Sequence, residues 1–339
     1  MLPTFADRLL AWFDLHGRKH LPWQQPRTPY RVWISEIMLQ QTQVPVVIDY
    51  FERFMRRFPS IEQLAAAEVD EVLALWAGLG YYARGRNLYK AAVVIRDVHG
   101  GALPADLDAL SSLPGIGRST AGAILSMGFD QRAAILDGNV KRVLARHAGV
   151  EGWPGRSAVS RQLWSLAEAR VPDSRFADYT QAAMDLGATL CRRHQPACHA
   201  CPVRQDCVAR RDQRTDEIPA PKPKARRQRR RSHVWLIRND LGQYLLHRRP
   251  PTGIWGGLWS LPETDQLETP PVALVQSPQS GPPLIHELSH FTWELCPVSA
   301  HAPVSLSIAD SDNAAWYAPD DLPGVPAPIR RLIEQDHQP

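Results

Sequence analysis

Apolar residues recur at spacings of three and four over the first 190 residues, which is the period of a helix that buries one face. This spacing predicts helices over Phe5–Phe13, Tyr30–Val44, Val46–Phe54, Ile61–Leu75, Arg86–Val98 and Leu163–Ala169. The alternating pattern of a half-buried strand is not found in this part of the sequence. We therefore expect an all-α domain whose helices are separated by Gly and Pro.

The pattern changes after residue 231. Segments His233–Arg238 and Gln243–Arg248 flank Asn239–Gly242, an arrangement that predicts a β-hairpin. Leu284–Val298 predicts another pair of strands, and Pro326–Gln335 predicts a terminal helix with Pro in its first turn. The last third of the chain is therefore predicted to be an α+β domain.

The 339 residues are enough for about two domains. Net charge is +4 over residues 1–220, +7 over 221–231 and −7 over 232–339. The sequence therefore predicts one domain over residues 1–207, a basic linker over 208–231 and a second domain over 232–339. The basic residues of the linker fit a solvated spacer and a phosphate-contacting strap equally well.

No apolar run reaches the roughly 18 residues needed to cross a bilayer. Asp7 and Asp14 interrupt the N-terminal segment where a signal peptide would be apolar. We expect a soluble, cytoplasmic protein.

Four of the five cysteines lie in one 17-residue segment, at Cys191, Cys198, Cys201 and Cys207. Disulfides are not expected in a chain without an export signal, and free thiols do not explain the clustering. A single Cys-x-x-Cys pair with one cysteine on each side favours a [4Fe-4S] cluster over zinc, which usually takes two such pairs. We expect a structural cluster here, and we expect Cys296 to be a small buried residue.

The segment Leu113–Gly117 is a tight turn between two predicted helices. Gly115 and Gly117 let the backbone approach a ligand, and the N–H groups that begin the next helix favour a phosphate. These features are typical of a helix-hairpin-helix that holds a DNA backbone without reading bases, with Gly115, Gly117 and Arg118 as the contacts. An ordinary loop between packed helices is the alternative.

Two carboxylates are candidates for catalysis. Asp137 is predicted to cap a helix that contains Lys141, and the helix N–H groups should keep its pKa low and the group ionised. An anion held in this way is suited to face a developing cation. Glu36 lies on a partly apolar helix face, where loss of water raises its pKa, as a general acid requires. A plain helix cap and a surface glutamate are the alternatives.

The Glu36 helix, the hairpin, the segment Leu136–Leu144 (LDGNVKRVL) and the four-cysteine loop together resemble the helix-hairpin-helix DNA glycosylases of the endonuclease III superfamily. The chain is most similar to the MutY adenine DNA glycosylases, and Gly78–Arg84 and Gly256–Trp259 carry the same resemblance. The resemblance implies a multidomain fold with an all-α glycosylase core, a [4Fe-4S] loop over 191–207 and a C-terminal α+β Nudix-like domain. It also implies a monomeric, nucleoid-associated enzyme that removes adenine paired with 8-oxoguanine or guanine in double-stranded DNA.

By this resemblance Glu36 protonates adenine and later positions or activates water, while Asp137 stabilises the sugar cation. Tyr81 is implied to be the wedge that enters the base stack beside the oxidised guanine. The residues implied to line the pocket of the flipped adenine are Trp23, Gln24, Leu39, Gln41, Val44 and Gln181. Gln24 stands where some members of the family have Arg.

Two departures from neighbouring families bear on the reaction. Strand-nicking relatives carry a lysine where this chain has Ser119, so base removal without a lyase step is implied. Gly257 and Glu263 match the first two fixed positions of a Nudix box, but the magnesium-binding carboxylates that should follow are missing. Pyrophosphate hydrolysis is therefore not expected.

Leu288, Ser289 and His290 occupy the loop that in this family usually reads Phe-Ser-His and touches 8-oxoguanine. The hydroxyl of Ser289 can serve both the N7–H donor and the O8 acceptor of the oxidised base. An ordinary strand-edge pair is the alternative for Ser289 and His290. Two other functions are weighed: a bifunctional glycosylase/lyase, opposed by Ser119, and a non-catalytic mismatch-binding protein, opposed by Glu36 together with Asp137.

Overall fold

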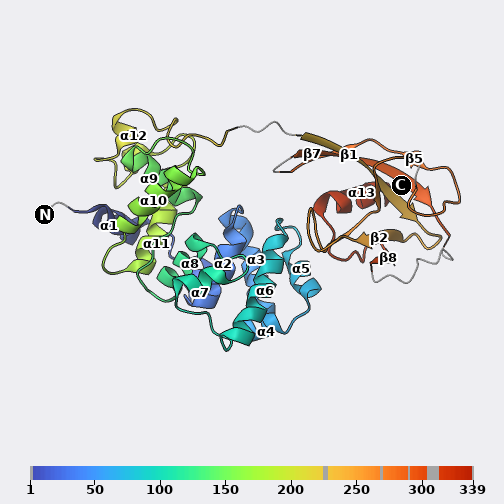
Figure 1. The fold of residues 1–339 in the computed structure, drawn as a ribbon, viewed down its shortest axis with the longest axis horizontal. Coiled ribbons are helices and arrows are strands. Elements are labelled where there is room, and N and C mark those ends of the chain that lie inside the picture. Colours follow the sequence, from blue (N-terminus) through green and yellow to red (C-terminus); the bar gives the residue numbers. More distant parts are fainter. Residues whose placement is uncertain (1–2, 224–227, 268–269, 289–290, 304–312, 338–339) are drawn as a thin grey trace. The chain divides into compact units, whose positions relative to one another are not determined.

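The computed structural model describes residues 3–223, 228–267, 270–288, 291–303 and 313–337 (Figure 1). The chain forms two compact units. One unit comprises Met1–Ala67 and Arg84–Lys224, and the other comprises Glu68–Ala83 and Ala225–Pro339.

The first unit consists of helices and connecting loops throughout its described residues, so the predicted all-α domain is confirmed. Its α-helices are α1 (Phe5–His16), α2 (Pro29–Leu39), α3 (Val44–Arg57), α4 (Ile61–Ala65), α6 (Ala83–Val98), α7 (Leu107–Ser112), α8 (Arg118–Ala123), α9 (Gly138–Ala148), α10 (Ser157–Ala169), α11 (Phe176–Asp185) and α12 (Val208–Arg211). Short 3₁₀ or π turns are η1 (Pro22–Gln24), η2 (Ile124–Gly128), η3 (Leu186–Leu190) and η4 (Cys198–Ala200). A further helix, α5 (Val69–Trp76), belongs to the second unit. No helix in the described ranges is long and apolar enough to cross a membrane.

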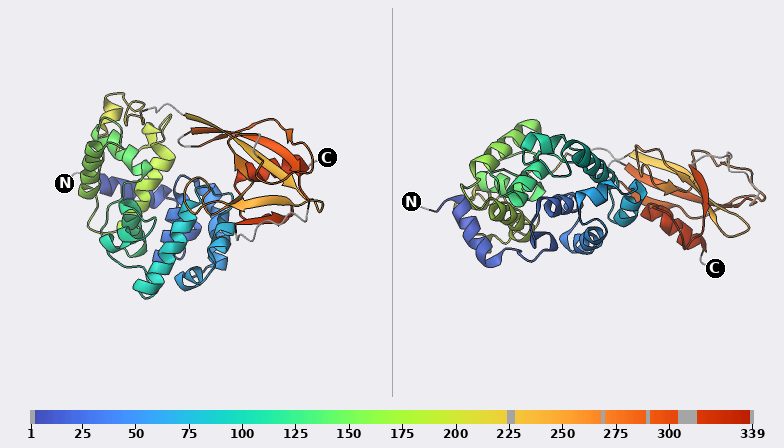
Figure 2. Two further views of the ribbon diagram at one scale, coloured as in Figure 1. Left: turned by 45° about the vertical axis from the view of Figure 1, so that its right-hand side comes forward. Right: turned by 90° about the horizontal axis from the view of Figure 1, so that it is seen from below.

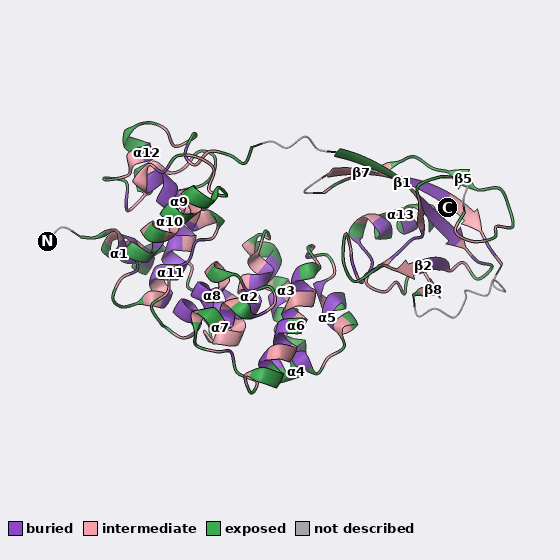
Figure 3. Cartoon of the chain, in the orientation of Figure 1, coloured by how far each residue is buried: buried purple, intermediate pink, exposed green. Residues whose placement is uncertain are grey.

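Helix α2 is buried on most of its sides. Trp33, Ile34 and Met38 are fully buried, and α2 packs against α3, α8 and η2. Helix α11 packs in turn against α1, α9 and η2. Buried residues, purple in Figure 3, occur on all of these helices. The core of the first unit therefore surrounds the helix that carries Glu36.

Two of the predicted helices are interrupted. The predicted helix Tyr30–Val44 is wrong at its end, because α2 stops at Leu39 and a new helix, α3, begins at Val44. Gln41, in the break, has a left-handed backbone with φ of 60°. The predicted helix Ile61–Leu75 likewise divides into α4 and α5. Apolar spacing continues across both breaks because the helix on each side of a break buries apolar residues of its own.

The second unit contains a mixed sheet with a helix on one face. Its strands are β1 (Gln228–Arg238), β2 (Tyr244–Arg248), β3 (Trp259–Ser260), β4 (Glu263–Thr264), β5 (Gln279–Ser280), β6 (Leu284–Glu287), β7 (Phe291–His301) and β8 (Ala314–Tyr317). Strand β1 pairs antiparallel with β2 and parallel with β7, giving the order β3-β2-β1-β7-β5. Helix α13 (Ala327–His337), drawn in red, lies against one face of this sheet (Figure 2). Its Ile329 and Ile333 belong to the same apolar core as Trp293. Both predicted strand pairs and the terminal helix are confirmed.

The predicted basic linker, residues 208–231, is partly structured. Helix α12 lies at its beginning, and β1 starts at Gln228, so that Arg229–Arg231 pair with Thr292–Glu294 of β7. The end of this segment is therefore a strand, because pairing with a distant part of the chain orders a stretch whose composition is typical of a spacer. The units divide between Lys224 and Ala225, inside the predicted linker.

Candidate active site

Glu36 lies near the C-terminal end of α2, a helix whose start is well defined. Thr28 Oγ1 accepts the Arg31 N–H at 3.3 Å, and Pro29 occupies the first turn. The Glu36 residue is half-buried. Burial raises the pKa of Glu36 to about 8, and the charge of Asp137 adds to this rise. At neutral pH the carboxyl therefore holds its proton, as the sequence predicts for a general acid.

Asp137 is the N-cap of α9, as predicted. Its Oδ1 accepts the Val140 N–H at 2.7 Å. The predicted low pKa is wrong: burial raises the pKa of Asp137 and outweighs the backbone N–H groups, Arg142 and Lys141, all of which lower it. These donors and cations surround Asp137 and favour its charged form, whereas nothing comparable lowers the pKa of Glu36. Of the two carboxyls, Glu36 is therefore the one suited to hold the proton, and Asp137 the one whose surroundings favour a charge.

Ser119 contacts the backbone beside Asp137. Ser119 Oγ, from α8, accepts the Leu136 N–H at 3.0 Å. The hydroxyl is thus held one residue before the catalytic candidate. Ser119, the residue expected to stand in place of a lysine, thus lies against the segment that precedes Asp137.

Two of the predicted adenine contacts are buried in η1. The Trp23 ring meets the Phe51 ring edge-on with centroids 5.5 Å apart. Gln24 is 7% exposed, and its amide nitrogen and oxygen are both buried without a hydrogen-bond partner. Such an orphaned amide is costly in the free protein, so it is a candidate to bind a ligand with both donor and acceptor groups.

The other predicted pocket residues have different surroundings. Gln181 is buried in α11, where its amide donates to Asp185 Oδ1 at 2.8 Å. Leu39 and Val44 are half-buried at the two ends of the break between α2 and α3, and Gln41 between them is exposed. Gln41 therefore lies on the surface and not in a closed cavity.

Tyr81, the predicted wedge, is half exposed and has a left-handed backbone with φ of 51°. Bulky residues rarely adopt this conformation, and strain of this kind often marks functional positions. Tyr81 falls in the segment Glu68–Ala83 of the second unit.

The predicted hairpin lies between α7 and α8. Gly115 has φ of 80°, and a Cβ there would come within 2.9 Å of Asn87 Cβ, so the turn requires glycine. Gly117 is the N-cap of α8 and has open space around it. Arg118, predicted to contact DNA, forms an ion pair with Glu168, and its guanidinium lies 4.0 Å from the Trp164 ring centroid. Neither partner could be identified from the sequence.

All four clustered cysteines line one cavity of the first unit. Cys191 follows η3, Cys198 begins η4 and Cys207 caps α12. Burial raises the pKa of Cys201 to about 11, so binding of a metal is needed to make it a thiolate. Within the described residues, no group of three or more His, Cys, Asp or Glu side chains is arranged around a position for a single metal ion.

Arg146 provides a test of what this cavity can hold. The side chain is buried, and it donates to Cys191 Sγ at 3.4 Å. Its other N–H groups meet the carbonyls of Arg192, Arg193 and Ile218. A buried guanidinium is stable only beside negative charge, which a group held by these four cysteines would supply. The donor set therefore fits a group bound by four thiolates.

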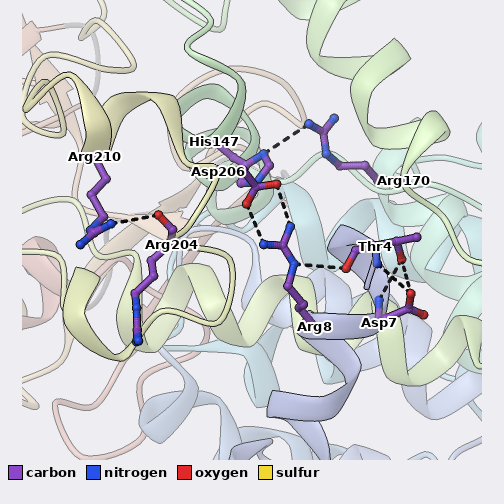
Figure 4. Close-up of polar contacts among 8 residues, drawn as sticks. All are labelled: Thr4, Asp7, Arg8, His147, Arg170, Arg204, Asp206 and Arg210. Carbon is purple, nitrogen blue, oxygen red and sulfur yellow. Dashed lines mark hydrogen bonds and ion pairs between the residues drawn. The ribbon is translucent and has the colours of Figure 1, made fainter. Parts of the chain in front are cut away.

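A network of ion pairs joins the cysteine loop to the N-terminal helix (Figure 4). Arg8 of α1 donates to both carboxylate oxygens of Asp206, at 2.8 and 2.7 Å, and holds the pKa of that carboxyl well below its usual range. His147 Nε2 of α9 lies 3.2 Å from Asp206 Oδ1. The His147 ring meets the Phe5 ring of α1 edge-on, with centroids 4.8 Å apart. Asp206, the residue next to Cys207, is thereby held by contacts from α1 and α9.

In the second unit, Leu288 is half-buried against the core, and its N–H donates to Phe291 O at 3.0 Å, which closes the β6–β7 hairpin. Ser289 and His290 lie outside the described residues. Glu263, matched to the Nudix box, forms an ion pair with Arg249.

Comparison with known proteins agrees with this geometry. Residues 34–169 match the HhH-GPD superfamily of base excision DNA repair proteins, and residues 233–335 match a NUDIX domain. Adenine DNA glycosylase of Buchnera aphidicola subsp. Schizaphis graminum is 35% identical to this chain over 344 residues, which cover 98% of each sequence. The chain belongs to the adenine DNA glycosylase family. This glycosylase is therefore a base excision repair enzyme that binds DNA, and the predicted family is confirmed.

Other relatives define how far the likeness extends. Human adenine DNA glycosylase is 43% identical over 226 residues, which cover 64% of this glycosylase and 41% of the human protein. A solved thermostable thymine-DNA glycosylase matches with a TM-score of 0.55 and 26% identity, over 61% of this chain and 95% of its own. A non-covalent endonuclease III–DNA complex matches with a TM-score of 0.52 over 61% of this chain and 94% of its own, and its 22% identity shows the fold alone. The predicted helix-hairpin-helix core with a Nudix-like C-terminal domain is thereby confirmed.

Three arginines near the site were not found from the sequence. Arg142 donates to Cys191 O and to Asn139 Oδ1, Arg146 contacts the cysteines, and Arg84 binds the end of α2. Only the spacing of Arg142 and Arg146, one turn apart on the helix that follows Asp137, could have indicated that both face the cysteine loop.

Proposed function

We propose that this glycosylase removes adenine paired with 8-oxoguanine, and adenine paired with guanine, from double-stranded DNA. We further propose that it stops at the abasic product. The observation that carries this proposal is the coupled pair of carboxyls, Glu36 and Asp137. Burial raises the pKa of Glu36 to about 8, and the charge of Asp137 contributes to this rise. A proton donor and an anion facing one region are what release of a purine from its sugar requires.

In this reaction Glu36 donates its proton to a ring nitrogen of the flipped adenine, which makes the base a better leaving group. The bond between the base and C1′ then breaks, and positive charge develops on the sugar. Asp137, ionised and held by the α9 N–H groups, stabilises that charge. Water adds to C1′, and Glu36, now a carboxylate, accepts the proton that the water loses.

Recognition of adenine is assigned to the residues in and beside η1. Gln24 has an orphaned amide that can pair with a base edge carrying both a donor and an acceptor. Trp23 provides an aromatic wall, and Leu39, Gln41, Val44 and Gln181 complete the pocket in this proposal. Tyr81 is assigned the wedge role, which fits its exposure and its left-handed backbone.

The reaction is proposed to be monofunctional because Ser119 offers no amine. A lyase step needs a Schiff base between a lysine and C1′. The Ser119 hydroxyl accepts the Leu136 N–H and so stays beside Asp137 as a neutral group.

Preference for 8-oxoguanine is assigned to the second unit, through Ser289 and His290, which follow Leu288 in the sequence. Oxidation turns N7 of guanine into a donor and adds an acceptor at C8, and a serine hydroxyl can bind both. Leu288 packs on the core and is proposed to anchor the hairpin.

The hairpin at Gly115 and Gly117 is proposed to hold the DNA backbone, with Arg118 released from Glu168 for this contact. Cys191, Cys198, Cys201 and Cys207 are proposed to hold a [4Fe-4S] cluster, whose contribution when bound is to fix the loop structurally. We also propose the division into a core over 1–207, a linking segment over 208–231 and a lesion-reading domain over 232–339, acting as a monomer.

Single-turnover excision tests the proposal. The purified protein is mixed in excess with labelled duplexes that carry adenine opposite 8-oxoguanine, guanine or thymine, and the products are resolved with and without alkali. We expect fast release opposite 8-oxoguanine, slower release opposite guanine, none opposite thymine, and strand breaks only after alkali. Equal release from all three duplexes, or breaks without alkali, would refute the proposal.

A further inference from the structure

The C-terminal end of α2 is capped by a side chain from another helix. The last carbonyls of any helix lack partners within it. Here Arg84, from the first turn of α6 and 9% exposed, donates from Nη1 to the carbonyls of Ile37 and Met38, each at 2.9 Å, and to that of Gln40. A cation at this end of a helix is also favoured by the helix dipole.

The same guanidinium fixes the turn that follows. Arg84 Nη2 donates to Thr42 Oγ1 at 3.2 Å, and the Thr42 N–H donates to Leu39 O at 3.2 Å. Gln41, between these contacts, has φ of 60°. A left-handed glutamine is unfavourable, so it persists only where its surroundings determine it.

The apolar pattern of the sequence favours continuing α2 through residue 44, yet the helix stops at Leu39. The guanidinium of Arg84 reaches three carbonyls at this break, those of Ile37, Met38 and Gln40. Its contacts account for both the end of the helix and the conformation of Gln41.

We propose that Arg84 is a positioning residue for base extrusion: it stops the helix of Glu36 at Leu39 and thereby holds Gln41 where the flipped adenine meets it. This inference rests on the proposed function, which puts Gln41 beside the adenine. Without Arg84, α2 continues into the turn, Gln41 moves out of reach, and the adenine is extruded less often although Glu36 and Asp137 remain.

The test compares Arg84→Met, which keeps the length but removes all donors, with Arg84→Lys, which keeps a cation. The matched control is Arg96→Met. Arg96 lies on the same helix, α6, and also donates to a carbonyl at the end of another helix, Ala65 O of α4 at 2.8 Å. If capping by α6 matters only for general stability, the two methionine variants should behave alike.

Extrusion is measured with 2-aminopurine in place of the target adenine, opposite 8-oxoguanine, in proteins that also carry Glu36→Gln, so that fluorescence reports the base leaving the stack. Excision of adenine is measured by single turnover with Glu36 intact. We expect Arg84→Met to lower both extrusion and excision by roughly 10- to 100-fold, since small displacements of positioning groups have effects of this order. Arg84→Lys should recover part of the loss, and Arg96→Met should leave both unchanged.

Thr42→Val extends the test to a change that leaves the buried guanidinium in place. It removes one charge-assisted hydrogen bond and should lower extrusion about 3- to 10-fold. Combined with Arg84→Met it should add nothing further, because both changes act on one turn.

Wild-type extrusion by a folded Arg84→Met variant would overturn the inference, and so would equal losses in Arg96→Met. If Arg84→Met does not fold, unchanged extrusion in Thr42→Val overturns it in the same way. A wild-type protein that releases no adenine from any duplex refutes the proposed function instead, so the two failures are distinguishable.

Discussion

Replacing Glu36 by glutamine should stop adenine excision and, at the same time, stabilise the protein at alkaline pH. The amide keeps the shape of the carboxyl but has no acidic proton to give. Loss of a general acid costs at least about 10²-fold in rate. Binding of the mispaired duplex should remain, because the contacts of η1 and of the hairpin are untouched.

The pH dependence follows from the pKa of Glu36, which burial raises from the ordinary 4.5 to about 8. At pH 7 a carboxyl with this pKa is about nine-tenths protonated, against roughly one part in 300 at its ordinary value. The wild-type single-turnover rate should therefore be nearly flat from pH 6 to pH 7.5 and fall about tenfold per pH unit well above pH 8.

The effect on stability has the opposite sign to that of a salt-bridged carboxylate. Because the folded state binds the Glu36 proton more tightly than the unfolded state, the free energy of unfolding falls as pH rises from about 4.5 to about 8. The slope is about 1.4 kcal/mol per pH unit where the shift acts in full, or a few kcal/mol in all. Glu36→Gln is free of this loss, so the variant should match the wild type near pH 4.5 and exceed it in stability at pH 8.

Thermal unfolding of both proteins between pH 4.5 and pH 9, beside single-turnover rates over the same range, is the assay. Glu52→Gln, a change of an exposed glutamate on α3, serves as the control and should alter neither quantity. Parallel stability curves for wild type and Glu36→Gln would refute the reasoning about burial, and near-normal excision by the variant would remove Glu36 from the acid role.

The wild-type chain should leave an intact abasic strand, whereas Ser119→Lys, which introduces an amine beside C1′, should give strand breaks without alkali. A denaturing gel of the untreated product distinguishes the two results. Prompt nicking by the wild type would contradict the monofunctional reaction. Gln24→Met removes an orphaned buried amide, so it should stabilise the DNA-free protein by about 1–3 kcal/mol while slowing excision. Wild-type excision by that variant would exclude Gln24 from the pocket. Cys198→Ser should lower the iron content and visible absorbance of the purified protein, and full iron occupancy would argue against its role as a ligand. Ser289→Ala should reduce the ratio of excision rates between 8-oxoguanine and guanine duplexes by roughly 5- to 150-fold. Ser277→Ala, which changes an exposed serine of the same unit, should leave this ratio unchanged. Equal ratios in the two variants would mean that other residues recognise 8-oxoguanine.

Local features of the fold could be predicted from the sequence because the signals that determine them are local. The cap at Asp137, the glycine turn at Gly115 and the hairpin after Arg238 each depend on a few neighbouring residues. The raised pKa of Glu36 could also be predicted, since its own helix supplies the apolar neighbours.

Features set by distant partners were missed or wrong. The end of α2 is set by Arg84, more than 40 residues further along the chain. Arg118 meets Glu168, 50 residues away, and so it is paired in the free protein. The pKa of Asp137 follows the sum of its burial and its donors, and only the donors are visible in the sequence. Basic residues 229–231 form a strand because β7 pairs with them.

The ion pair between Arg8 and Asp206 bears on the order in which the chain is assembled. Helix α1 is synthesised well before its partner carboxylate, which follows 198 residues later in the chain. At about 5–20 residues per second, Arg8 waits for roughly 10–40 seconds before its partner has been made. The helical unit therefore cannot close progressively from its N-terminus. The contact between α1 and the cysteine loop forms only after residue 206 has been made, so arrival of the cysteine loop is also the step that fixes the N-terminal helix in place.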